Sequence, residues 1–194
     1  MSQQSFEPEE IWTLGHGLKS IEDFLETATH NGIQSIVDVR STPASTRAPQ
    51  YNAHALRRSL AGIGVSYVPM GAELGGRPPE DEFYDAEGHV LYRHLAESAR
   101  FRSGINRLES GARRFRVAIL CSETDPTRCH RNLLIGRVLR ERGHRVSHIL
   151  SDGRTVAFDD QLVSVVGLPG FEEDQWRSLV QVRQGPLLND SFSG

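Results

Sequence analysis

Five short apolar runs, rich in strand-forming residues, alternate with helical patterns along this chain of 194 residues. Strands that alternate with helices favour a mostly parallel sheet that is covered on both faces. We therefore expect an α/β fold, with a single three-layer domain and a mostly parallel five-stranded sheet between two layers of helices. The runs cover residues 11–14, 35–39, 65–70, 116–121 and 145–150.

Helices are expected where a capping residue or an apolar stripe at helical spacing appears between these runs. In the last of them, Asp125 stands at the N-cap and Pro126 at the first helical position. Cys129 and His130 then fall in the first turn, where free N–H groups and the helix dipole favour an anion or a thiolate. The expected helices span residues 20–30, 52–62, 100–112 and 125–143.

One domain over residues 11–180 is the simplest organisation, with a disordered tail over 1–10 and a C-terminal tail over 181–194. No apolar run approaches the roughly 20 residues that cross a bilayer, and no signal sequence opens the chain. Two cysteines do not make a disulfide framework. These features predict a cytoplasmic protein with free thiols and no membrane association.

Net charge is only −3, so no overall field marks the chain as a nucleic-acid binder. Lys19 is nevertheless the only lysine among 22 basic residues. Arginine offers a planar fork that suits phosphate and carboxylate groups. A codon bias from a GC-rich genome explains the same composition.

Reactive side chains follow the predicted strands, and in a doubly wound sheet these positions lie on one edge. If the first strand is central and the fourth lies beside it, His16 and Cys121 flank the topological switch point. The candidates for catalysis are His16, Cys121, Glu123, Cys129 and His130. The candidates for substrate binding are Arg40, Ser45, Gly75, Gly76 and Arg131.

Several of these candidates have an ordinary structural explanation as well. His16 lies between two glycines, which allow a ligand to approach closely. Arg40, expected to be exposed beside a buried Asp38, forms a plausible phosphate cradle with nearby serines. Cys121 could equally be an ordinary buried thiol, and His148, inside the fifth run, is expected to be a core histidine.

Known motifs do not match. Six residues separate Cys121 from Arg128, whereas a tyrosine-phosphatase signature needs five. Structural zinc sites have four ligands in paired spacings, which Cys121, Cys129 and His130 lack. The glycine-rich segments match neither a dinucleotide fingerprint nor a phosphate-binding loop. No metal ligand is assigned on this basis, and the cofactor is left open.

Several phrases together resemble the domain of unknown function 488 family, in the family's order and over about residues 11–153. The resemblance implies a single α/β domain of bacterial or archaeal cytoplasmic type and supplies no reaction. Gly17 stands where the family usually has a serine. The matching phrases are residues 13–17, 37–40 with Pro43 and Ser45, 73–76, 120–123, 129–131 and 148–150.

Three functions are left open by the sequence. The first is an enzyme that acts on an anionic, phosphate-bearing or nucleotide-like substrate, held by Arg40, Arg131 and a helix N-terminus. In it a cysteine is the nucleophile, or His16 or Glu123 the general acid or base. The second is a nucleic-acid-binding or repair-associated module that uses arginines on phosphates. The third is a metal protein in which His16 joins the Cys/His residues; the oligomeric state is undetermined.

Overall fold

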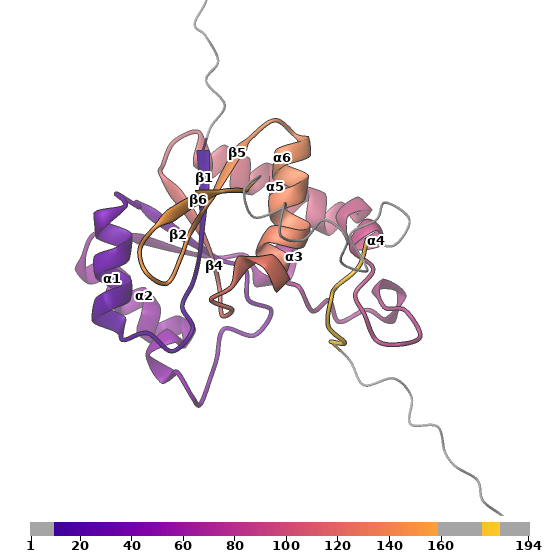
Figure 1. The fold of residues 1–194 in the computed structure, drawn as a ribbon, viewed down its shortest axis with the longest axis horizontal. Helices are drawn as coiled ribbons and strands as arrows, with labels where there is room; N and C mark the ends of the chain where they lie inside the picture. Colours follow the sequence, from indigo (N-terminus) through magenta and orange to yellow (C-terminus); the bar gives the residue numbers. More distant parts are fainter. Residues whose placement is uncertain (1–9, 159–175, 183–194) are drawn as a thin grey trace, which may run out of the picture.

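The computed structural model describes residues 10–158 and 176–182, and its centre is a six-stranded sheet in the order β3-β2-β4-β1-β5-β6 (Figure 1). Neighbouring strands are parallel, except that β6 runs antiparallel to β5. The α/β architecture is as predicted. The strands are β1 (Glu10–Gly15), β2 (Ser35–Asp38), β3 (Ser66–Pro69), β4 (Val117–Cys121), β5 (Arg145–Ile149) and β6 (Thr155–Ala157).

The prediction of five strands was wrong by one, because β6 adds a short edge strand. It has three residues, too few to show the alternation by which a strand is recognised in a sequence. Its segment is equally compatible with a short helix until pairing with β5 decides it. Backbone pairing with β5, and not the local sequence pattern, determines that this segment is a strand.

Helices cover both faces of the sheet, with α1 and α2 on one side and α3, α5 and α6 on the other (Figure 1). The α-helices are α1 (Ile21–His30), α2 (Ala53–Gly62), α3 (Gly71–Leu74), α4 (Tyr92–Glu97), α5 (Ala99–Ala112) and α6 (Arg137–Glu141). Shorter helical turns are η1 (Pro49–Tyr51), η2 (Asp81–Phe83), η3 (Pro126–Arg128) and the π-helical η4 (Arg131–Gly136).

Two apolar cores lie on the two faces, because successive side chains of a strand point in opposite directions. Ile11 and Ile119 pack in the core beneath α5 and α6. Trp12 and Leu120, one residue along on the same strands, pack in the core beneath α1 and α2. All five residues of β4 are buried, as expected of a central strand covered on both sides.

The topological switch point lies between β1 and β4, as the sequence predicted. From β1 the chain crosses by α1 and α2 to β2 and β3, whereas from β4 it crosses the other face to β5. Gly15 and Cys121, the last residues of the two strands, are paired in register. The loops after these two strands therefore leave toward opposite faces, which is the arrangement at which open α/β sheets generally bind their ligands.

The helices predicted over 20–30, 52–62 and 100–112 are confirmed, but the fourth is not continuous. Asp125 caps only η3, through a 2.8 Å bond from the Thr127 N–H to its carboxylate. Cys129 then has an extended backbone, and the chain re-enters a helix after it. One capped turn satisfies the Asp-Pro signal, so the sequence did not show where the longer helix begins.

The predicted tails over 1–10 and 181–194 lie almost wholly outside the described residues; Glu10 begins β1. The assignment of 11–180 to one domain stays a prediction. No helix among the described residues combines the length and the apolar character needed to cross a membrane.

Candidate functional site

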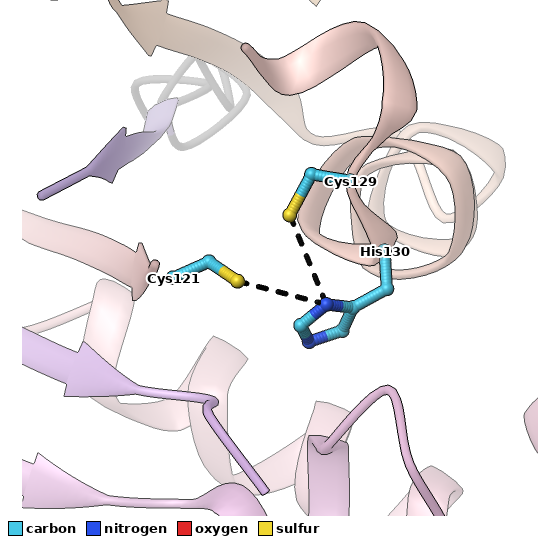
Figure 2. Close-up of side chains that lie close together, drawn as sticks. All are labelled: Cys121, Cys129 and His130. Atoms are coloured by element: carbon cyan, nitrogen blue, oxygen red, sulfur yellow. Dashed lines mark hydrogen bonds between the residues drawn. The ribbon is translucent and has the colours of Figure 1, made fainter. Parts of the chain in front are cut away.

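Two thiols and an imidazole meet at the carboxyl end of β4 (Figure 2). Cys121 ends the strand, while Cys129 and His130 lie where the chain enters the next helix. The Nδ1 atom of His130 is 3.8 Å from the Sγ of Cys121 and 3.8 Å from the Sγ of Cys129. Their donor atoms all lie within 4.8 Å of one another. We call these three residues the thiol–imidazole cluster.

The His130 ring is held from its other side. Its Nε2 lies 3.3 Å from the carbonyl oxygen of Val39, just after β2, and only a protonated nitrogen can donate to that oxygen. In the neutral ring Nδ1 then carries the lone pair, which faces both sulfurs. Gly76 lies against the same ring: a Cβ there would be 2.6 Å from the His130 Cγ.

The two thiols have opposite proton affinities. The pKa of Cys121 lies well below its usual range because the Cys129 thiol donates a hydrogen bond to it; burial opposes this shift. The backbone N–H of Glu123 lowers the pKa of Cys121 further, and His130 does so when its ring is protonated. Burial, followed by the bond to Cys121, raises the pKa of Cys129. Of the two thiols, Cys121 is therefore the one that loses its proton first.

Arg131 is wholly buried and shapes the loop after β4. Its guanidinium donates to the backbone carbonyls of Glu123 and Thr124, the second at 2.9 Å. Gly15 makes room for this, since a Cβ there would overlap the Glu123 carbonyl oxygen. Within the described part of the chain Arg131 has no carboxylate partner, so its charge stays uncompensated beside the cluster.

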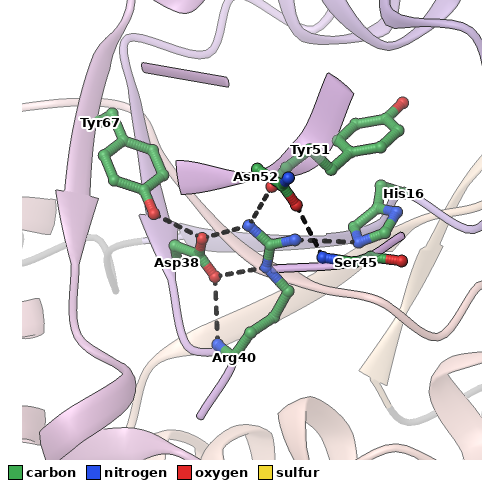
Figure 3. A network of polar contacts seen from close by, with 7 residues as sticks. All are labelled: His16, Asp38, Arg40, Ser45, Tyr51, Asn52 and Tyr67. Atoms are coloured by element: carbon green, nitrogen blue, oxygen red, sulfur yellow. Dashed lines mark hydrogen bonds and ion pairs between the residues drawn. The ribbon is translucent and has the colours of Figure 1, made fainter. Parts of the chain in front are cut away.

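Arg40 was expected to be exposed, but it is 5% exposed in a buried ion pair with Asp38 (Figure 3). The Asp38 carboxylate accepts the Nε–H of Arg40 at 2.8 Å and its Nη2–H at 2.5 Å. The Tyr67 hydroxyl donates to the same carboxylate at 2.7 Å. Nη2 also donates to the carbonyl of Tyr51, at 2.8 Å. These bonds turn the guanidinium inward, away from any substrate.

His16 completes this network rather than offering a free acid or base (Figure 3). Its ring stacks on Tyr51 at 4.0 Å between centroids. With a proton on Nδ1, the ring donates to the Gly17 carbonyl at 2.8 Å, and Nε2 accepts from the Arg40 Nη1 at 3.2 Å. Burial lowers the pKa of His16. The hydrogen bond to the Gly17 carbonyl raises this pKa but does not cancel the effect of burial, so the ring is neutral.

Comparison with known proteins gives one match. The family model described as "Domain of unknown function DUF488" matches residues 20–138, more than half of the chain. The chain belongs to this family. No curated protein and no solved structure matches it.

The stretch matched by the DUF488 family contains the whole thiol–imidazole cluster, which joins three of the five residues predicted for catalysis. Glu123, a fourth, contributes through its backbone, and its side chain is exposed. His16, the fifth, hydrogen-bonds through its backbone N–H to the Cys121 carbonyl at 3.1 Å. The loops after β1 and β4 therefore meet through their backbones, whereas the imidazole of His16 belongs to the network around Arg40.

Ser45, Gly75 and Gly76, which were predicted to bind substrate, make contacts within the loops near the thiol–imidazole cluster. The Ser45 N–H donates to the side chain of Asn52 at 2.6 Å, and the Ser45 hydroxyl accepts the Ala48 N–H at 3.2 Å. A Cβ on Gly75 would lie 2.4 Å from the Ser41 hydroxyl, so this loop packs closely on the chain after β2. Gly76 extends the same packing to His130.

Sequence reasoning missed three contributors to the site: the two tyrosines around Arg40 and the carbonyl of Val39. Tyr67 comes from β3 and Tyr51 from η1, and no local pattern links either to Arg40. The Asp38–Arg40 pair did leave a signal, because residues two apart on extended chain share a face.

His148 is the core histidine that the sequence predicted. It is fully buried and joined by hydrogen bonds to Thr13 at 2.7 Å and to Asn132 at 3.0 Å. Burial is the main cause that lowers the pKa of His148, to about 3, and the charge of Arg131 adds to it. His148 is therefore neutral and belongs to the interior, not to the site.

Proposed function

We propose that this chain is an enzyme that acts on an anionic substrate at the thiol–imidazole cluster, with the Cys121 sulfur as the electron-pair donor of the centre. The observation that carries this proposal is the place of the cluster. Its three side chains meet outside the carboxyl end of a central strand, at the switch point where open α/β sheets bind their ligands. Structural thiols of a core have no reason to collect there with an imidazole.

Charge supports an anionic substrate. Arg131 places an uncompensated positive charge behind Cys129. Two exposed arginines border the cluster in sequence: Arg77 follows Gly76, and Arg128 precedes Cys129. Two acidic side chains between β3 and α5 are neutralised, since Glu73 and Glu80 pair with arginines at 2.7 Å and 2.6 Å.

The roles first expected for two arginines and one histidine change in this proposal. Arg40, Arg131 and His16 are positioning residues, because each already hydrogen-bonds to backbone or side-chain groups of the chain. Substrate contacts fall instead to exposed groups such as Arg77 and Arg128. No feature of the described residues favours a nucleic-acid module over this enzyme, and cytoplasmic location stays a prediction.

The test starts from substrate depletion. The protein as purified is incubated with a defined mixture of nucleoside monophosphates, sugar phosphates and acyl phosphates, and mass spectrometry follows each compound. We expect one class to be consumed by the wild type and left intact by Cys121→Ser. His94→Gln changes an exposed histidine outside the site and serves as the matched control.

Alkylation checks the centre independently of any substrate. In chelator-treated protein, iodoacetamide should modify Cys121 about tenfold faster than Cys129, because the thiolate is the nucleophile. Inorganic phosphate should slow that reaction by binding beside the cluster, where we propose that the anionic substrate lies. Equal, slow modification of both cysteines, with no compound consumed, would refute the proposal.

A further inference from the structure

The thiol–imidazole cluster has the spacing of a metal site before any metal is considered. A tetrahedral zinc ion, with Zn–S of about 2.3 Å and Zn–N of about 2.0–2.1 Å, holds sulfur and nitrogen about 3.5–3.6 Å apart. Both Sγ–Nδ1 separations here are 3.8 Å. Each sulfur therefore lies within a few tenths of an ångström of the separation from Nδ1 that coordination requires, and all three donor atoms lie within 4.8 Å of one another.

The orientation of His130 is the second observation. A metal-bound histidine almost always donates its other ring N–H to a carboxylate or a backbone carbonyl, which fixes its tautomer. His130 makes this contact, from Nε2 to the Val39 carbonyl. Its Nδ1 lone pair then points between two sulfurs, and one lone pair accepts only one good hydrogen bond. A cation bound to all three atoms accounts for this arrangement better than a thiol bond does.

The surroundings of the sulfurs are the third observation. The backbone N–H of Glu123 faces the Cys121 sulfur, and that of Arg131 faces the Cys129 sulfur. Outer-shell hydrogen bonds of this kind also hold metal-bound thiolates in place, and the buried guanidinium of Arg131 lies beside Cys129. Two adjacent thiolates in a buried pocket repel each other unless a cation lies between them.

We propose that Cys121, Cys129 and His130 bind one zinc ion as a three-ligand centre whose fourth position is open to the substrate. Thiolate and imidazole donors select zinc, and three protein ligands with an open position are typical of catalytic zinc sites. This inference rests on the proposed function, because it assigns the metal to the same centre. Each thiol that is still protonated gives its proton to solvent when the ion binds.

A zinc ion bound by the Cys121 sulfur also explains how the centre would attract an anionic substrate. Two thiolates and a neutral imidazole carry a charge of −2, which the ion neutralises, while Arg131 adds one positive charge nearby. An anionic oxygen or sulfur of a substrate is therefore attracted to the open position.

Cobalt substitution tests the site in the wild-type chain without any variant. Metal-free protein titrated with Co²⁺ should develop sulfur-to-cobalt charge-transfer absorption that saturates at about one ion per chain. Zinc added afterwards should abolish that absorption, and elemental analysis of protein purified without chelator should find zinc at the same ratio. No charge-transfer absorption and substoichiometric metal would overturn the proposal.

Variants then assign the ligands. Cys129→Ser and His130→Ala should each lower zinc affinity, measured against a chromophoric chelator, by about tenfold or more. His89→Gln is the matched control: it disrupts the Asp85–Glu87–His89 group, whose Asp85 already pairs with Arg177 at 2.5 Å. Affinity that is lost in this control and kept in the cluster variants would refute the assignment.

The outcomes separate this inference from the proposed function. If the protein takes up neither ion while Cys121 still alkylates rapidly and substrate is consumed, the zinc site is wrong and the enzyme stands. If zinc binds stoichiometrically and no compound is consumed, the metal site stands and the proposed enzyme falls.

Discussion

Replacing Asp38 by Asn tests whether the buried ion pair holds the edge of the sheet together. The Asp38 carboxylate accepts four hydrogen bonds, from the Arg40 N–H, Nε and Nη2 and from the Tyr67 hydroxyl. An asparagine oxygen keeps the first two, but its NH₂ group faces Nη2 and the hydroxyl. The guanidinium is then left buried without its counter-charge.

Two independent estimates agree on the size of the effect. Removing one partner of a buried pair costs about 3–5 kcal/mol. Two lost bonds to a charged group, at about 1.5–3 kcal/mol each, give a similar sum. Solvent screening does not reduce these figures much, because the Arg40 and Asp38 side chains are only 4% and 1% exposed. Tyr67→Phe removes a single bond and should cost about 1.5 kcal/mol.

The assay is urea unfolding followed by circular dichroism at pH 7, with the slope m checked for each variant. Arg107→Gln is the control, since it breaks the Glu73–Arg107 pair, which is partly exposed, and should cost less than about 1 kcal/mol. An Asp38→Asn protein that unfolds within about 1 kcal/mol of wild type, at unchanged m, would show that the buried pair is not coupled as the contacts indicate.

Three further predictions follow. Burial and the charge of Arg131 hold the pKa of His148 at about 3, so between pH 6.5 and 3 the unfolded chain binds a proton that the folded chain does not. The free energy of unfolding should therefore fall by up to about 1.4 kcal/mol for each unit by which the pH is lowered. In urea titrations at several pH values, His148→Gln should make this loss of stability smaller. Gly76→Ala should push the His130 ring aside and weaken zinc binding about tenfold, while Gly111→Ala, with open space around its new methyl group, should leave zinc affinity unchanged; equal affinities would disprove the contact. Arg131→Met leaves two backbone carbonyls without their donor and should lower stability by about 2–4 kcal/mol in the urea assay, whereas a neutral result would mean that the buried charge costs as much as its bonds contribute.

The sequence predicted the switch point because the rule behind it is topological. Once the strands are parallel, their carboxyl ends share an edge, and Cys121 and His130 must lie there whatever their partners are. The helices at 20–30 and 100–112 were equally accessible, since Ser20 and Ser98 cap them with local side-chain bonds. Contacts between residues close in sequence determine these helices, so the sequence alone is enough to predict them.

Contacts between distant segments were not accessible in this way. Whether Arg40 faces solvent or Asp38 depends on Tyr51 and Tyr67, which arrive from other elements. An arginine after a strand looks the same in both cases. The break at Cys129 depends likewise on Arg131 folding back onto the loop carbonyls, a contact that capping rules do not contain.

The ion pair and the thiol–imidazole cluster form one structural unit through Val39. The Arg40 N–H donates to the Asp38 carboxylate at 3.1 Å, which closes a tight turn around Val39. That turn aims the Val39 carbonyl at the Nε2 of His130, and the tautomer of the ring follows from it. An arginine that the sequence suggested for a phosphate therefore acts through the backbone, by turning the lone pair of Nδ1 toward the two sulfurs.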